Sequence, residues 1–195
     1  MSSNQYDLER DEKYLELLSQ SFPTIADAST EIINLSAILN LPKGTEHFLA
    51  DIHGEYEAFQ HVLKNASGNI RRKVHELFGD TLRANEEREL CTLIYYPEQK
   101  LELVKQAESD IIDWYHITIH HLVDVCRDVS SKYTRSKVRK SLPVDFSYII
   151  QELLHEHSED KDKADYVSAI IKTIISTGRA DDFIIALCGV IQRLS

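Results

Sequence analysis

The chain has 195 residues, 43% of them hydrophobic, and its 22 Lys and Arg residues against 32 Asp and Glu residues give a formal charge of −10. The acidic balance argues against nucleic acid as a partner, because such binding comes chiefly from Lys and Arg neutralising phosphates. The 6 Gly and 4 Pro residues are too few for the many turns of a β-sandwich or barrel. A folded, soluble, mainly α protein is therefore predicted.

The N-terminal segment, residues 1–45, contains two predicted helices. Apolar residues recur at helical spacing over Tyr6–Ser19, ahead of a proline, and again over Thr24–Asn40. The second helix is expected to stop at Leu41-Pro42-Lys43-Gly44, because both Pro and Gly interrupt helices.

The next segment, residues 46–67, changes character. Residues 46–51 form a short apolar run that predicts one strand, followed by a tight loop up to Gly54. Residues 55–64 return to helical spacing. This helix is expected to stop near Gly68, because a residue without a Cβ suits the left-handed conformation past a helix end.

Residues 68–195 are predicted to be helical to the last residue. Apolar positions from Leu101 to Tyr133 form the seam of a long amphipathic helix, with breaks expected near Ser109 or Ser130. The other predicted helices cover Asn69–Phe78, Ala84–Tyr96, Asp145–Glu156, Lys161–Thr177, which stops at Gly178, and Asp181–Leu194. The whole chain thus predicts about eight helices and one strand.

The sequence Asp51-Ile52-His53-Gly54 is the feature that best indicates chemistry. In an extended chain residues i and i+2 project from the same side, so a carboxylate oxygen of Asp51 and a ring nitrogen of His53 can reach one cation. Mixed oxygen and nitrogen ligands suit Mn²⁺, Fe or Zn²⁺ better than Ca²⁺. The alternative is a capping Asp with an incidental His.

Residues 51–59 resemble the first motif of the calcineurin-like metallophosphoesterases, and residues 46–82 with their flanks resemble the class III fructose-1,6-bisphosphatases. The resemblance covers essentially the whole chain. It implies that these 195 residues are the N-terminal part of a longer enzyme, with the strand at 46–51 in its α/β core and residues 68–195 as a helical insertion. The implied reaction is hydrolysis of fructose 1,6-bisphosphate to fructose 6-phosphate and phosphate, in gluconeogenesis, with two divalent metal ions, expected to be Mn²⁺.

By position in the family motif, the resemblance implies that Asp51 and His53 ligate one metal ion, and it identifies no general acid. Gly79-Asp80 begins like the family's second motif, Gly-Asp-x-x-Asp-Arg-Gly, but lacks the second Asp. Gly68-Asn69-Ile70 begins like Gly-Asn-His but has Ile in place of His. A two-metal centre needs more ligands than this, so we expect the chain alone to be inactive.

Other polar clusters have plainer interpretations. His116 and His120 are one helical turn apart but lack a carboxylate that would complete a motif such as His-Glu-x-x-His, so both are expected to flank the helix seam. The remaining histidines singled out, expected at the surface, are His61, His75, His155 and His157. The main basic cluster, either a phosphate or partner contact or a solvated helix face, comprises Lys132, Arg135, Lys137, Arg139 and Lys140.

The three cysteines, Cys91, Cys126 and Cys188, are odd in number and far apart in sequence. This favours free thiols in a reducing compartment. The N-terminus has no apolar stretch typical of a signal peptide, and no run approaches the about 18 apolar residues of a membrane span. We therefore expect a cytoplasmic protein with no membrane partner.

Three functions remain open at this point. The first is the fructose-1,6-bisphosphatase, and the second is another calcineurin-like phosphoesterase acting on a phosphoprotein or a dinucleotide. The third is a non-enzymatic helical assembly module, in which the seam from Leu101 to Tyr133 packs on a partner and Asp51 and His53 bind nothing. A homo-oligomer is compatible with all three.

Overall fold

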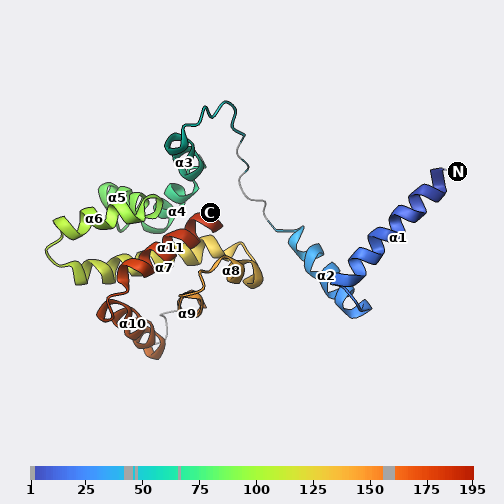
Figure 1. The fold of residues 1–195 in the computed structure, drawn as a ribbon. Helices are drawn as coiled ribbons and strands as arrows, with labels where there is room; N and C mark the ends of the chain where they lie inside the picture. The colour runs from blue at the N-terminus through green and yellow to red at the C-terminus, as the bar shows by residue number, and fades with distance from the viewer. Residues whose placement is uncertain (1–2, 42–45, 47, 66, 156–160) are drawn as a thin grey trace. The chain divides into compact units, whose positions relative to one another are not determined.

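The computed structural model describes residues 3–41, 46, 48–65, 67–155 and 161–195 (Figure 1). These residues form eleven helices and no strand, so the mainly α prediction is confirmed, while the number of helices is larger than expected. The predicted stop at Pro42–Gly44 and the position of His157 lie outside the described residues. The chain divides into two compact units, Met1–Lys43 and Gly44–Ser195.

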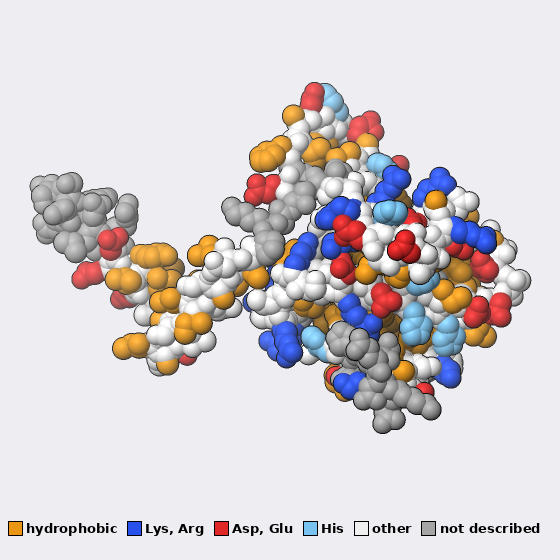
Figure 2. All heavy atoms as spheres, turned by 180° about the vertical axis from the view of Figure 1, so that it is seen from behind, with side chains coloured by type: hydrophobic (Ala, Val, Ile, Leu, Met, Phe, Trp, Pro, Cys, Tyr) orange, Lys and Arg blue, Asp and Glu red, His pale blue; other side chains and the backbone are white. Residues whose placement is uncertain are grey.

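The N-terminal unit consists of α1 (Ser3–Ser21) and α2 (Ile25–Ile38). Thr24 begins α2 with a capping box: its hydroxyl accepts from the Asp27 N–H at 3.1 Å, and the Asp27 carboxylate accepts from the Thr24 N–H at 3.2 Å. Although α2 is largely apolar, none of its residues is buried, and Ile25 is 87% exposed. Figure 2 accordingly shows hydrophobic side chains on the coloured part of this unit. A helix of this kind is typical of the interior of a larger protein.

The C-terminal unit is organised around α11 (Ala180–Leu194), which packs most extensively on α7 (Ile111–Ser131) and also contacts helices on either side (Figure 1). Phe183, Leu187 and Ile191 on α11 are completely buried. The other helices of this unit are α3 (Tyr56–Asn65), α4 (Asn69–Phe78), α5 (Ala84–Tyr95), α6 (Pro97–Ala107), α8 (Arg135–Ser141), α9 (Ser147–His155) and α10 (Lys161–Ser176). None of the described helices is long and apolar enough to cross a membrane.

The predicted long seam is divided at both of the expected breaks. Asp110 begins α7, because its carboxylate accepts from the Asp113 N–H at 3.0 Å. Thr134 begins α8 in the same way, with its hydroxyl accepting from the Lys137 N–H at 3.2 Å. Each cap satisfies an N–H that has no partner inside its helix, so it favours a new helix over continuation of the previous one. These breaks account for part of the excess in helix number.

Glycines with positive φ separate helices where the sequence predicts. Gly178 follows α10 with φ 71°; its N–H donates to the Ile175 carbonyl and the Arg179 N–H donates to the Ile174 carbonyl, both at 3.0 Å. These two bonds form a Schellman motif. Gly68, with φ 62°, lies between α3 and α4.

The strand predicted over residues 46–51 is wrong. The described part of this range, residues 46 and 48–51, is neither helix nor strand. A strand exists only when its backbone N–H and C=O groups pair with a neighbouring strand, and the described residues contain none. Phe48 is 93% exposed, so the apolar run also lacks a packing partner there.

Candidate metal centre

Asp51 and His53 lie side by side in the segment that leads into α3. Oδ1 of Asp51 is 2.9 Å from Nε2 of His53, and the two side chains are 77% and 72% exposed. The structure thus brings together an oxygen and a nitrogen donor, as the spacing in the sequence predicts. The two atoms face solvent rather than the helical core.

The backbone that brings them together is not the extended one expected from the sequence. Asp51 has φ 66°, His53 has φ 52° and Gly54 has φ 76°, all in the left-handed region. Gly54 adopts this conformation without penalty, whereas Asp51 and His53 each incur backbone strain, of about 1–3 kcal/mol for such outliers. The Glu55 N–H closes the turn by donating to the Ile52 carbonyl at 3.0 Å. Strain of this kind is characteristic of functional turns.

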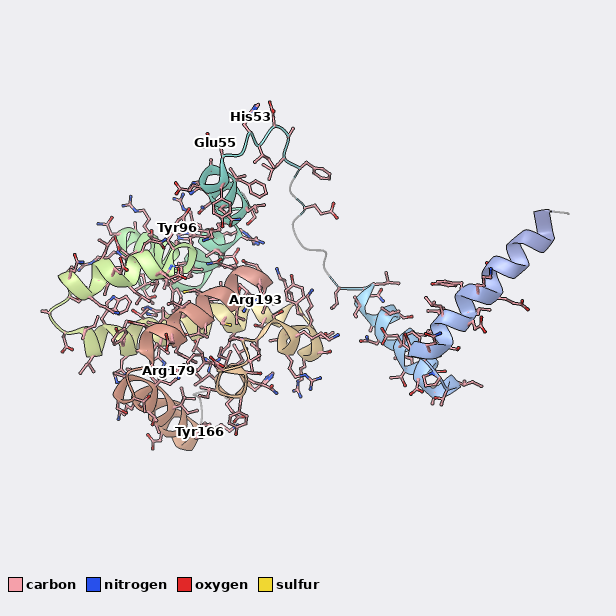
Figure 3. All side chains as sticks on the ribbon, viewed as in Figure 1. His53, Glu55, Tyr96, Tyr166, Arg179 and Arg193 are labelled. Carbon is pink, nitrogen blue, oxygen red and sulfur yellow. The ribbon has the colours of Figure 1, made fainter. Side chains whose placement is uncertain are left out.

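Helix α3 carries this turn and is joined to the helical body through polar contacts. His61 Nδ1 is hydrogen-bonded to the Tyr96 hydroxyl, and Asn65 Nδ2 donates to the same hydroxyl at 3.3 Å. Lys64 Nζ donates to the Tyr95 carbonyl at 3.2 Å. No residue of α3 is buried. Figure 3 shows Tyr96 at the body and His53 and Glu55 at the far end of α3.

This anchoring at Tyr96 is a feature that sequence reasoning missed. His61 is at the surface as expected, but 35 residues separate it from its partner in the sequence. Helical periodicity identifies which face of a helix is apolar, but it does not identify which polar groups meet across two helices. The one signal was Pro97, which places Tyr96 at the junction between α5 and α6.

Asp51 and His53 fit a divalent metal as two of its ligands, but they do not complete a site. The described residues contain no group of three or more His, Cys, Asp or Glu side chains that could hold a metal ion. Glu55, the next carboxylate along the chain, is labelled beside His53 in Figure 3 but forms no such group with the pair. Further ligands would have to come from outside the described residues.

Asn69, in the Gly68-Asn69-Ile70 sequence, has a structural role. Its Nδ2 donates to the Ser195 carbonyl at 2.8 Å, and its Oδ1 accepts from Arg72 Nη2 at 2.9 Å. Both ends of the amide are therefore used within the helical body. This agrees with its exclusion as a metal motif on sequence grounds.

Comparison with known proteins identifies the family. A model of the family described as Firmicute fructose-1,6-bisphosphatase matches residues 13–195. The chain belongs to this family. Proteins named fructose-1,6-bisphosphatase class 3 from Phocaeicola vulgatus and Bacteroides thetaiotaomicron are each 74% identical to it, over 188 and 185 residues. The protein of that name from Clostridium novyi is 62% identical over 187 residues.

The similarity covers most of this chain but a minor part of each relative. The aligned residues are 96% of this chain and 28% of the Phocaeicola vulgatus protein, with the same 28% for the Bacteroides thetaiotaomicron protein. The chain therefore spans little more than a quarter of the length of the curated fructose-1,6-bisphosphatases that it matches. No solved structure matches it.

Of the α7 histidines in this member of the fructose-1,6-bisphosphatase family, His121 takes part in the packing between helices. Burial lowers the pKa of both His120 and His121. The ring of His121 packs on Phe78 with centroids 4.8 Å apart. His116 and His120 are not part of any metal-holding group among the described residues.

The three cysteines are free and buried, as expected. Burial raises the pKa of the Cys91 thiol to about 11 and that of Cys126 to about 12, and it raises that of Cys188 as well. A protonated, buried thiol is a poor nucleophile and a poor metal ligand. These side chains therefore act as small hydrophobic residues of the core.

Proposed function

We propose that this chain is part of a class 3 fructose-1,6-bisphosphatase, a calcineurin-like metallophosphoesterase that hydrolyses fructose 1,6-bisphosphate to fructose 6-phosphate and phosphate. The supporting observation is 74% identity over 96% of the chain to a protein of that name. The corresponding setting is gluconeogenesis in the cytoplasm. The chain contributes the first metal motif and a large helical region to this enzyme.

In this proposal Asp51 and His53 hold one of two divalent metal ions, with Mn²⁺ as the expected metal. Such ions polarise the phosphate and lower the pKa of a bound water molecule. The role of this chain is to present one anionic oxygen and one neutral nitrogen together. Oδ1 of Asp51 and Nε2 of His53 already face each other at 2.9 Å, a separation at which both atoms can bind one cation.

The left-handed turn and its attachment to α3 support this role. Residues 51–54 are held in a conformation that costs free energy in an isolated chain, and α3 fixes their position relative to the helical body through the His61–Tyr96 contact. These features orient the two donors before a metal binds. Preorganised ligands lose less conformational entropy on binding.

Two donors are insufficient for the reaction, and the exposed apolar surface suggests where the other ligands originate. α2 has no buried residue, and Phe48 and Ile52 are 93% and 44% exposed on either side of Asp51. Apolar surface of this extent is normally covered in the native protein. We infer that the part of the enzyme absent from this chain packs on the apolar side chains beside Asp51 and supplies the remaining ligands, and that the chain alone is inactive.

A chimera tests the proposal. Residues 1–195 replace the matching part of the Phocaeicola vulgatus enzyme, to which they are 74% identical over 188 residues. We expect the chimera to release phosphate from fructose 1,6-bisphosphate in the presence of Mn²⁺, and the isolated chain to release none. Asp51→Asn or His53→Asn in the chimera should lower kcat/KM by about a hundredfold or more, because each removes a metal ligand.

Metal content provides a readout that is independent of activity. Bound Mn²⁺ per chain should fall in Asp51→Asn and His53→Asn, whereas Asp80→Asn, which changes the rejected second motif, should leave metal content and kcat/KM within about twofold. Retention of Mn²⁺ and of activity by both Asp51→Asn and His53→Asn would refute the ligand assignment. Phosphatase activity of the isolated chain would refute the proposal that the reaction needs ligands from the rest of the enzyme.

A further inference from the structure

Helices α8 and α9 line a small cavity whose walls include basic and polar side chains. Its volume is about 210 Å³. The polar side chains that line it are Arg135, Ser136, Arg139, Gln151 and His155. We propose that this cavity binds the phosphate group of a small phosphorylated molecule.

The charge of the cavity supports an anionic ligand. Among the residues that the structure describes, its lining contains two arginines and no carboxylate, although the chain as a whole has a formal charge of −10. Arg135 and Arg139 are one turn apart on α8, a spacing at which like charges repel each other. Three lysines of the same basic cluster, Lys132, Lys137 and Lys140, increase the positive potential nearby.

Neither arginine has an ion-pair partner among the described residues. Some arginines elsewhere in the molecule do: Arg72 pairs with Glu76 at 2.9 Å and Arg179 pairs with Asp182 at 2.8 Å. The guanidinium groups of Arg135 and Arg139 are exposed and retain their donors for a ligand. Two forked guanidinium groups are well suited to a phosphate, whose oxygens can accept two parallel hydrogen bonds from each.

The apolar residues of the lining anchor the two helices that carry these donors. Val138, between the two arginines on α8, is 8% exposed, and Leu154 on α9 is also 8% exposed. Their burial attaches both helices to the core. The Gln151 amide and the Ser136 hydroxyl add uncharged donors from the two sides of the cavity, so a bound phosphate would meet donors from both helices.

The cavity is distinct from the candidate metal centre. In Figure 1, α8 and α9 lie on a different side of the helical body from α3, which carries Asp51 and His53. A phosphate bound between α8 and α9 is therefore not the phosphate under attack at the metal motif. The proposal does not depend on the proposed phosphatase activity.

Titration of the 195-residue chain with inorganic phosphate tests the proposal. At constant low ionic strength, we expect the Nε–H NMR signals of Arg135 and Arg139 to shift and saturate, and chloride at the same ionic strength to leave them unchanged. Calorimetry should show binding that weakens by about tenfold or more in Arg135→Gln/Arg139→Gln, since two charge-assisted contacts are lost. The phosphate affinity of Arg135→Lys/Arg139→Lys, which retains the charge but not the forked guanidinium group, should lie between that of the unchanged chain and that of Arg135→Gln/Arg139→Gln.

Lys137→Gln/Lys140→Gln is the matched control, because it removes the same charge from the same helix outside the cavity. It should weaken phosphate binding by less than about threefold, through the general field alone. An equal loss in both double variants would overturn the proposal in favour of a diffuse basic surface, and tighter binding of a DNA duplex would assign that surface to nucleic acid.

Absence of any phosphate-dependent shift at Arg135 and Arg139 would also overturn the proposal. Circular dichroism of each variant verifies folding; the substituted side chains are exposed, so no change in the spectrum is expected.

Discussion

The hydroxyl of Tyr115 donates a 2.6 Å hydrogen bond to Oδ1 of Asp181, 66 residues further along the chain. Lys105 of α6 pairs with the other carboxylate oxygen, Oδ2. One carboxylate thus joins α6 and α7 to the first turn of α11, where the helix dipole favours a negative charge. These contacts align the central helix of the body with two of its neighbours.

Tyr115→Phe should therefore destabilise the chain. It removes the hydroxyl but keeps the ring, so the lost hydrogen bond to a charged acceptor should lower the free energy of unfolding by about 1–2 kcal/mol. Urea unfolding followed by circular dichroism measures this change. Tyr166→Phe is the control, because that hydroxyl donates to the Glu152 carboxylate at the surface at 3.3 Å, and its loss should cost less than about 0.5 kcal/mol. An equal decrease in the free energy of unfolding for both variants would show that the hydrogen bond to Asp181 stabilises the fold no more than the surface hydrogen bond to Glu152 does.

Stability should decrease as the pH falls from about 7 to 5. Burial lowers the pKa of His120 and His121 in the folded chain, while in the unfolded chain they titrate near about 6.5. Between these values the unfolded state binds more protons, so the free energy of unfolding falls with decreasing pH. His121→Leu should reduce this slope. His155→Gln, which changes an exposed histidine, should leave the slope unchanged; a parallel slope in both variants would contradict the role of His121.

Much of the helical fold could be predicted from local sequence. The seam from Leu101 to Tyr133 identified the core-facing side of α7, and Pro97 lies in the first turn of α6, where proline is favoured. Breaks near Ser109 or Ser130 were expected, but the caps at Asp110 and Thr134, which divide the seam into three helices, were not identified from the sequence. The strand could not be predicted reliably, because strand formation depends on a partner strand that no local pattern reveals.

The candidate sites divide in the same way. The proximity of Asp51 and His53 could be predicted, because the two residues are only two positions apart in the sequence. The left-handed backbone that joins them was not predicted. Only some of the residues that line the phosphate cavity could be predicted. Arg135 and Arg139 stood out as a basic cluster, whereas His155 comes from another helix and joins them only through tertiary packing.

Leu187→Ala tests the central position of α11. Leu187 is completely buried, and its truncation leaves a cavity beside α7, so we expect a loss of about 2–5 kcal/mol in the free energy of unfolding. Leu103→Ala removes the same atoms from α6, where the side chain is 60% exposed, and should cost less than about 0.5 kcal/mol. Both values come from urea unfolding. A small loss at Leu187 would mean that the core around α11 is less tightly packed than the structure indicates.

Two glycine substitutions to alanine should change stability in opposite directions. A Cβ at Gly178 would have no heavy atom within 4 Å, so space is not limiting, but φ is 71° there. Gly178→Ala should therefore cost about 1 kcal/mol, the penalty of a left-handed residue with a side chain. Gly189 lies inside α11, where its added Cβ would be 3.4 Å from Arg193 Nη1, the end of a flexible side chain. Alanine at that position should add up to about 1 kcal/mol through helix propensity.

The opposite signs make this pair informative about the backbone rather than about packing. Gly178→Ala and Gly189→Ala add the same methyl group, so any difference in the midpoint of urea unfolding reflects the conformation of each position. If Gly178→Ala proved neutral, the Schellman motif that ends α10 would not require its left-handed residue. If Gly189→Ala were strongly destabilising, the contact with Arg193, which also donates to the Ser141 carbonyl at 3.0 Å, would be tighter than ordinary side-chain flexibility allows.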